Sequence, residues 1–348
     1  MPTTLNRRHI LAGLPALVAG LRATPAGAEP APEVTSVRLP VYINASDCQA
    51  PLYIAETLLR GEGITDVQWV GVKFGEGMSD FKAVTPEDGS DSADWIRNDL
   101  TDFDWNFPPG HIRNIAIGAP IKVLAGIHVG CLELFANDTI RSVADLKGKR
   151  VGVDLLTGVS HQMLIAIVAS VGLDPYKDIE WFTDPAYNPV EMFAEGKIDA
   201  FLGGPPVPQE MRTRKLGHVI LSTGIDRPWS QYYCCMMSGR SEFLEKNPAA
   251  TKRILRAVMK SVDFCVSDPQ AAAKEAVAKG FASNYDYALE ALTDGSYNTW
   301  RDYDPEDSLR FWALRMQETG IIKDNPNDLI FRGSDWRFLE ELKREMKT

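Results

Sequence analysis

Residues 145–154 of the chain read DLKGKRVGVD; TGVSH follows at 157–161, and an apolar run extends from Met163 to Val171. This pattern predicts a turn, a short β-branched strand and a helix opened by small and hydroxyl residues. A helix N-terminus exposes unpaired backbone N–H groups and the positive end of the helix dipole. Thr157 and Ser160 therefore mark a candidate cradle for a carboxylate, sulfonate, phosphate or polar ring edge. The alternative is that one of these hydroxyls only caps the helix.

Strand and helix patterns alternate around this segment, which is typical of an α/β architecture with mainly parallel sheets. We expect strands at 37–43, 67–72, 121–127, 150–153, 198–202, 218–221 and 232–237. We expect helices between them at 51–60, 93–100, 160–171, 190–195 and 206–215. After Ser241 the pattern becomes helical, at 248–266, 269–279, 305–319 and 335–346, and several of these helices begin with Asn-Pro or Asp-Pro.

The first residues are typical of an export signal. Arg7-Arg8 precede an apolar run, and the small residues Ala26-Gly27-Ala28 stand before Glu29. We expect cleavage after Ala28 and a periplasmic mature chain. The twin arginines favour export of a folded protein, although the general export route also tolerates them.

Charge and cysteine content narrow the function. The signal carries three arginines and no acid, so its removal takes the formal net charge from −10 to −13 and makes nucleic acid an improbable partner. The five cysteines are an odd number for an oxidising compartment, and whether any of them form a disulfide stays open. We interpret Cys234-Cys235 as buried strand side chains.

Several phrases along the mature chain resemble a known family. They are APLYIAE at 50–56, GAPIKVLAG at 118–126, SVADLKGKRVGV at 142–153, VGLDP at 171–175, FAEGKIDAF at 193–201 and EFLEKNP at 242–248. The chain resembles the substrate-binding subunits of ABC importers, in the periplasmic type II class that includes nitrate, sulfonate and taurine receptors and thiamine-pyrimidine-precursor receptors.

The resemblance implies two lobes with a ligand cleft between them and helices at the C-terminus. Lobe 1 would comprise 33–130 and 239–348, and lobe 2 would be the inserted segment 131–238. The implied function is to deliver a small organic ligand, either neutral or anionic, to a membrane permease after hinge closure. We expect a monomer.

Candidate ligand-binding residues stand where strands end and helices begin. Those of the first lobe are Asp47, Cys48, Gln49, Trp105, Asn106, Phe107 and His128. Those of the second are Thr157, Ser160, His161, Gly203, Pro205, Trp229 and Tyr232. Aromatic walls with a few polar groups are the usual makeup of a small-molecule pocket, although each aromatic residue alone is more often part of a core. A carboxylate such as Asp47 can pair with an amine or a ring N–H group.

No cofactor is expected. His128 and His161 have neither a carboxylate nor a third histidine at metal-ligand spacing, so we expect no metal site. No catalytic phrase is found. One alternative is an enzyme similar to the fungal pyrimidine-precursor synthase, although only two cysteines stand near its cysteine-rich phrase and they are shifted. The other is a ligand sensor for a membrane receptor.

Overall fold

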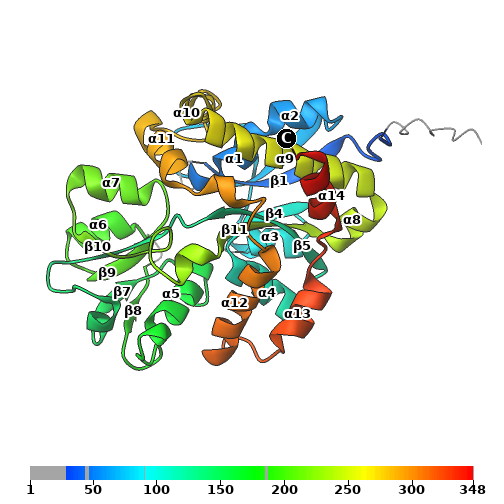
Figure 1. Cartoon of the computed structure of the whole chain (residues 1–348). Coiled ribbons are helices and arrows are strands. Elements are labelled where there is room, and N and C mark those ends of the chain that lie inside the picture. Colours follow the sequence, from blue (N-terminus) through cyan, green and yellow to red (C-terminus); the bar gives the residue numbers. More distant parts are fainter. Residues whose placement is uncertain (1–28, 44–46, 90, 185–186, 348) are drawn as a thin grey trace, which may run out of the picture. The chain divides into compact units, whose positions relative to one another are not determined.

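The computed structural model describes residues 29–43, 47–89, 91–184 and 187–347 (Figure 1). The predicted export signal lies outside these residues. Ala31–Thr348 form one compact unit. None of the helices in the described ranges is both long and apolar enough to cross a bilayer.

The first sheet is parallel and contains β1 (Ser36–Ile43), β2 (Asp66–Lys73) and β3 (Lys82–Ala83) in that order. Alternate residues of β1 are buried under helices, as expected for a strand that is covered on one face. The helix expected at 51–60 is interrupted at Ala55, which separates α1 (Ala50–Ile54) from α2 (Glu56–Gly61).

The second sheet is antiparallel and places β11 (Tyr233–Arg240) between β4 (Phe103–Asn106) and β5 (Ile121–Val129). Phe103 and Trp105 of β4 belong to the core beneath β1. Asn106, which alternates with them, contacts α3 (Ser92–Arg97). The sequence patterns did not predict α4 (Pro108–Ala116), which follows β4.

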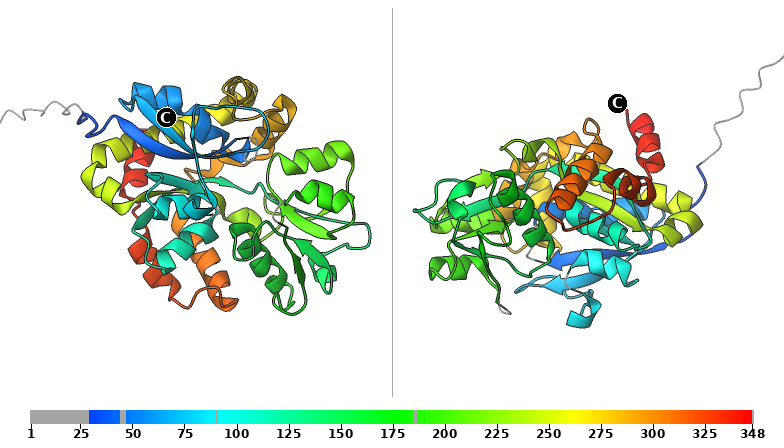
Figure 2. Two further views of the ribbon diagram at one scale, coloured as in Figure 1. Left: turned by 180° about the vertical axis from the view of Figure 1, so that it is seen from behind. Right: turned by 90° about the horizontal axis from the view of Figure 1, so that it is seen from below.

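The third sheet collects strands and helices from the middle of the chain, drawn in green in Figures 1 and 2. Its strand order is β10 (His218–Ser222), β6 (Glu133–Ala136), β9 (Ala200–Gly203), β7 (Arg150–Gly152) and β8 (Glu180–Phe182). Its helices are α5 (Val159–Ser170), α6 (Pro189–Ala194) and α7 (Val207–Arg214).

The expectation of mainly parallel sheets was wrong. Among the described residues, four of the eight strand pairs are antiparallel. A parallel neighbour requires a long crossover connection. β6 follows β5 after three residues, and β11 follows β10 with only the short helix η4 (Trp229–Gln231) between them, but these short connections join strands of different sheets. Within the sheets, β6 runs antiparallel to β9 and β10, and β11 runs antiparallel to β4 and β5.

The C-terminal part is helical, as predicted. Its helices are α8 (Ser241–Lys246), α9 (Pro248–Ser267), α10 (Pro269–Ala278), α11 (Tyr285–Asp294), α12 (Pro305–Glu318), α13 (Pro326–Gly333) and α14 (Arg337–Glu345). The remaining short helices are η1 (Asp47–Gln49), η2 (Pro86–Asp88), η3 (Val143–Leu146) and η5 (Tyr297–Thr299). Proline stands in the first turn of α9, α10, α12 and α13, where the missing N–H group has no partner to lose.

Candidate functional site

Two predicted site segments from different sheets touch each other. The Asp47 N–H group, in η1 after β1, donates to the Pro205 carbonyl after β9 at 3.3 Å. Asp47 is buried, and burial raises the pKa of its carboxyl to about 7. The first and third sheets therefore meet at the ends of these strands.

Gln49 is held by other protein groups. Its Nε2 donates to the Trp105 carbonyl at 3.2 Å, and its Oε1 accepts a hydrogen bond from the Tyr53 hydroxyl at 2.8 Å. Trp105 itself is fully buried in the core. These bonds fix the start of α1 against the end of β4.

Asn106 has a similar structural role. Its Nδ2 donates to the Ser92 hydroxyl at 3.1 Å, and its Oδ1 accepts from the Phe107 N–H group at 2.7 Å. Phe107 precedes α4 and is half-buried between the two large core clusters. The β4–α4 junction is therefore held in one conformation.

The N-terminus of α5 has no side-chain cap. Its N-cap residue is Gly158, so neither Thr157 nor Ser160 takes the capping role that was the alternative for this segment. Thr157 has φ +76°, a strained value for a β-branched residue. Its N–H group donates to His161 Nδ1 at 3.0 Å, and burial lowers the pKa of this imidazole to about 4.

Arg113 of α4 reaches this helix start, and the sequence patterns missed it. Its Nη1 donates to the Thr157 carbonyl at 3.3 Å, while its Nη2 lies 3.2 Å from Asp94 Oδ1 and 3.5 Å from Asp91 Oδ1. The sequence analysis could have found Arg113 only by predicting α4, because this helix places the side chain next to the start of α5.

The remaining predicted residues are more dispersed. Trp229 and Tyr232 pack on α12, where the Tyr232 ring stacks on Phe311 with centroids 3.9 Å apart. Gly203 ends β9, and a Cβ atom there would lie 3.0 Å from Val207 Cγ1. Trp229 is part of the core around α12, and Tyr232 packs against that core.

A cluster of sulfur and nitrogen donors lies at the same strand ends. One donor atom each from Cys48, His128, Cys131 and Cys235 lies within 4.8 Å of all the others. His128 and Cys235 are register partners on β5 and β11, and Cys131 is the second residue after β5. The Cys131 Sγ also lies 3.3 Å from the Sγ of Cys234. We call the first four residues the thiol–imidazole cluster.

The electrostatics of the cluster favour separated charge. Burial disfavours an imidazolium at His128, but the neighbouring Cys235 thiolate outweighs this and raises the pKa of His128 to about 10. Burial likewise disfavours the Cys235 thiolate, while hydrogen bonds from Cys131, Cys234 and Cys48 and the charge of His128 lower its pKa well below the usual thiol range.

The expectation of no metal site rested on spacing along the chain, and that is why it missed this cluster. Its members are separated by 80, 3 and 104 positions, and they come together because β5 pairs with β11 and η1 brings Cys48 beside them. The one local hint of a metal site was that His128 and Cys131 both come shortly after the end of the strand predicted at 121–127. None of the five cysteines, which all lie in described ranges, is in a disulfide.

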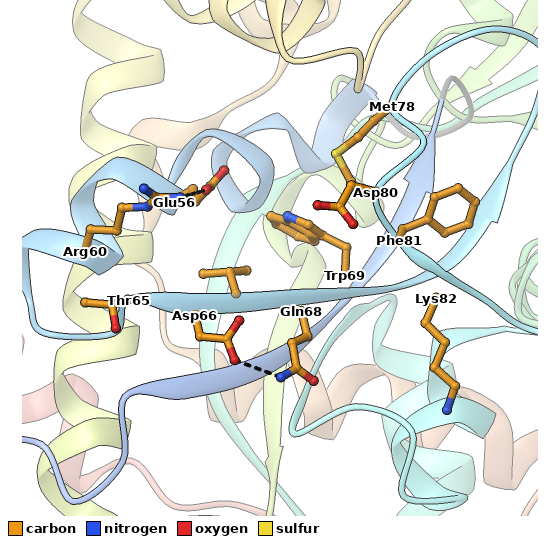
Figure 3. A pocket seen from close by; sticks show the side chains of 11 residues that line it. Glu56, Arg60, Thr65, Asp66, Gln68, Trp69, Met78, Asp80, Phe81 and Lys82 are labelled. Carbon is orange, nitrogen blue, oxygen red and sulfur yellow. Dashed lines mark hydrogen bonds and ion pairs between the residues drawn. The ribbon is translucent and has the colours of Figure 1, made fainter.

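Two cavities lie away from the predicted site residues. Figure 3 shows one of about 480 Å³, where Trp69 of β2 lies opposite Met78 and Phe81. The other, of about 340 Å³, lies beside α14 and includes Trp336 and Lys343 in its wall. Glu56, Arg60, Asp66, Asp80 and Lys82 make the first cavity strongly polar.

Solved structures show that the fold is that of periplasmic binding proteins. The nitrate-binding protein NrtA from Synechocystis PCC 6803 superposes with a TM-score of 0.72 at 17% identity, over 91% of this chain and 90% of that one. The desulfurization enzyme DSZB also shares the fold, with a TM-score of 0.56 at 13% identity over 90% of this chain and 100% of the enzyme. The two-lobe α/β class predicted from the sequence is therefore confirmed.

The chain belongs to the NMT1/THI5 like family, whose model matches residues 77–272. A putative binding protein of Brucella abortus is 29% identical over 197 residues, which cover 51% of this chain and 60% of that protein. The bicarbonate-binding protein CmpA of Synechococcus elongatus is 30% identical over 97 residues, which cover 28% of this chain and 21% of CmpA. The matched segments thus cover between one fifth and three fifths of the length of these relatives.

Proposed function

We infer that the protein is an extracytoplasmic solute-binding protein that delivers a small organic ligand to the permease of an ABC importer. Family membership and the periplasmic-binding fold support this function. The related proteins named for bicarbonate and nitrate binding support a receptor over a synthase-like enzyme. The export signal supports a periplasmic location, with cleavage after Ala28 by either export route. We propose in addition that the mature chain is a monomer.

The observation that carries the proposal is a pair of hydrogen bonds, one between strand ends of different sheets and one between α4 and the segment before α5. Asp47 contacts Pro205, and Arg113 contacts Thr157. In the proposed division, each bond joins lobe 1 (33–130 and 239–348) to lobe 2 (131–238). Ligand contacts that exist only when these segments approach would favour the closed form.

The chemistry of these segments suggests the ligand class. The uncapped N-terminus of α5 and the Arg113 guanidinium would hold one anionic group of the ligand. Asp47, whose pKa burial raises to about 7, would accept a hydrogen bond from an amine or ring N–H group when ionised. An organic molecule that carries both kinds of group fits better than a simple inorganic anion.

A thermal-shift screen tests the ligand class. Ligand at 100 times its dissociation constant should stabilise the folded protein by about 2.7 kcal/mol. The panel should contain nitrate, bicarbonate, alkanesulfonates, pyrimidines and zwitterionic organic acids. A strong shift with organic compounds supports the proposal. Shifts from nitrate or bicarbonate alone would contradict the ligand class, and no shift with any small molecule would contradict the receptor function.

A further inference from the structure

We propose that Cys48, His128, Cys131 and Cys235 form a tetrahedral binding site for a thiophilic d¹⁰ cation, Zn²⁺ or Cu⁺. The proposal is independent of the solute-binding function, because it concerns these four side chains and not the uncapped N-terminus of α5. It rests on four features: donor type, spacing, the orientation of His128 and the rigidity of the surrounding backbone.

The donor set is of a kind that metals select. Three thiols and one imidazole make the Cys₃His combination of tetrahedral zinc sites, and thiolates also favour Cu⁺. With Zn–S bonds of about 2.3 Å, a tetrahedron places its sulfur atoms roughly 3.8 Å apart. The donor atoms here already lie within 4.8 Å of one another. Side-chain adjustments of about 1 Å would close the site around an ion.

His128 is oriented as a metal ligand would be. Its Nδ1 lies 3.1 Å from the Gly130 carbonyl, to which a protonated Nδ1 donates. The side chain is fully inaccessible to solvent and also interacts with the Cys48 and Cys235 thiols, while Nε2 makes no close hydrogen bond among the described residues. Metal-bound histidines usually donate their second N–H group to a carbonyl or carboxylate, which fixes the tautomer and the ring plane. A cation held between this nitrogen and the thiols would satisfy the ring where no close hydrogen bond does.

The backbone around the cluster is held from several directions. The pairing of His128 with Cys235 across β5 and β11 fixes two donors on one sheet. Tyr297 donates its hydroxyl hydrogen to the Cys48 carbonyl at 2.8 Å, and its ring lies 4.8 Å from the His128 ring. Preorganised donors bind a metal ion more tightly, because less conformational freedom is lost on binding.

Burial and access are compatible with an ion site. Cys48, His128 and Cys235 are buried, whereas Cys131 is half-buried and offers the exposed edge of the cluster. Binding would replace the thiol protons with the cation and release them to solvent. The site would tie the segment after β1 to the strands β5 and β11.

Cys234 provides the competing outcome. Its Sγ lies 3.3 Å from that of Cys131, so an oxidised protein could join these two residues in a disulfide and remove Cys131 from the donor set. A site built for a cation predicts that these thiols stay reduced once the ion is bound. The alternative predicts a disulfide and no bound ion.

The first experiment titrates the full-length mature chain, freed of metal by chelation under reducing, oxygen-free conditions. Zn²⁺ and Cu⁺ are added separately, and bound metal is measured after gel filtration. We expect one ion of Zn²⁺, Cu⁺ or both per chain. Co²⁺ in place of Zn²⁺ should give thiolate charge-transfer absorption and the visible bands of a tetrahedral ion. If neither ion binds at about one equivalent per chain, the proposal is overturned.

Two variants give a matched comparison. Cys131→Ser changes the half-buried ligand, whereas Cys265→Ser changes a fully buried cysteine of α9 outside the cluster. Cys131→Ser should weaken metal binding by more than about 100-fold, because loss of an outer-shell partner alone costs about 10–100-fold. Cys265→Ser should bind as the unaltered chain does. Equal affinities for the two variants would contradict the assignment.

A measurement on the unaltered chain avoids dependence on variant folding. The reduced protein is alkylated under native conditions with and without Zn²⁺, and the modified cysteines are identified by mass spectrometry. The ion should protect Cys131 from alkylation and leave the reactivity of unrelated cysteines unchanged. Unprotected Cys131, or a Cys131–Cys234 disulfide that persists in the metal-treated chain, would refute the site.

Discussion

Ser160 lies in the first turn of α5, half-buried, and its hydroxyl makes no hydrogen bond within the part of the chain that the structure describes. Ser170, at the other end of the helix, donates to the Ile167 carbonyl at 2.6 Å. Because Gly158 is the N-cap residue, the Ser160 hydroxyl is not needed to hold the helix start.

Ser160→Ala should therefore weaken ligand binding without weakening the fold. We expect a loss of about 0.5–1.5 kcal/mol in binding free energy, or about 1.5–3 kcal/mol if the ligand group is charged. Ser170→Ala is the control and should leave affinity unchanged. Titration calorimetry and urea unfolding on both variants check this, and a drop of about 1 kcal/mol in apo stability with intact affinity would restore the capping role.

Asp104 and His111 are fully buried beside each other, with Oδ2 and Nδ1 3.5 Å apart. Burial raises the pKa of Asp104 to about 8 and lowers that of His111 to about 4. Both shifts favour the neutral forms, so at pH 7 this pair is a carboxylic acid beside a neutral imidazole and not an ion pair.

The pair predicts a pH dependence of stability. Folded Asp104 keeps its proton up to about pH 8, whereas the unfolded residue loses it near its ordinary pKa of 3.8, so the free energy of unfolding should fall as pH rises between these values. The opposite slope from His111 is confined below its ordinary pKa of 6.5. Between pH 6.5 and 8 the unaltered chain should lose about 1–2 kcal/mol of unfolding free energy through Asp104. The Asp104→Asn variant should not show this loss.

Urea titrations at several pH values measure this effect. Asp138→Asn controls for the change in net charge, because the Asp138 side chain is 94% exposed. The unaltered chain and the Asp138 variant should lose stability in parallel above pH 6.5. If the Asp104 variant follows the same curve, the neutral-pair assignment is wrong.

At the scale of elements, the turn between β5 and β6 depends on Gly130. Its φ is +59°, and a Cβ atom there would lie 2.1 Å from the Gly224 Cα. The two connections between the second and third sheets therefore pass each other at contact distance. Gly148 has φ +70° but open space around its Cβ position.

Comparing Gly130→Ala with Gly148→Ala should separate two contributions to the loss of stability: the backbone conformation and the steric contact. Both substitutions place a side chain in the left-handed region, at a cost of about 1–2 kcal/mol. Gly130→Ala should cost more than this, because the Gly224 backbone must also move. Chemical unfolding of the two variants gives the comparison, and equal losses of stability would show that the close approach is not rigid.

The sequence predicted those elements that have their own periodicity. The strands at 37–43 and 121–127 and the helices at 248–266 and 305–319 agree with β1, β5, α9 and α12 within a few residues. α4 was missed because Pro108-Pro109-Gly110 suggests a break, although proline is tolerated in a first turn. The strand directions were missed because they depend on how the connections cross between sheets.

Site residues were predictable only where a strand end marks them. Asp47 and Thr157 were proposed in this way, and in the structure each contacts a segment of another sheet. Arg113, Cys131 and Cys235 were not among the predicted site residues, since their relevance arises from neighbours that are distant in sequence. For the same reason Gln49 and Asn106, which looked available for a ligand, are bonded within the protein.

At the scale of the whole molecule, Arg212 of α7 links the third sheet to α11. Its Nη2 lies 2.6 Å from Glu290 Oε1, and its Nη1 lies 2.6 Å from Glu133 Oε2. In the proposed division, Arg212 and Glu290 belong to opposite lobes. The hinge account implies that this exposed pair forms on closure and stabilises the closed form.

Glu290→Gln should therefore lower ligand affinity modestly. Exposed ion pairs contribute about 0–1 kcal/mol, which corresponds to at most a fivefold change in affinity. The effect should fade at high salt. Glu191→Gln, which removes a pair with Arg214 between α6 and α7, is the matched control. Equal effects of the two substitutions on affinity would count against an interlobe role.

The central claim is that the chain binds a solute and does not transform it. The most direct test is an equilibrium titration with the compound selected by the thermal screen, followed by prolonged incubation and recovery of that compound from the denatured protein. The account predicts one molecule bound per chain and its recovery chemically unchanged. Formation of more than one equivalent of product per chain would contradict it.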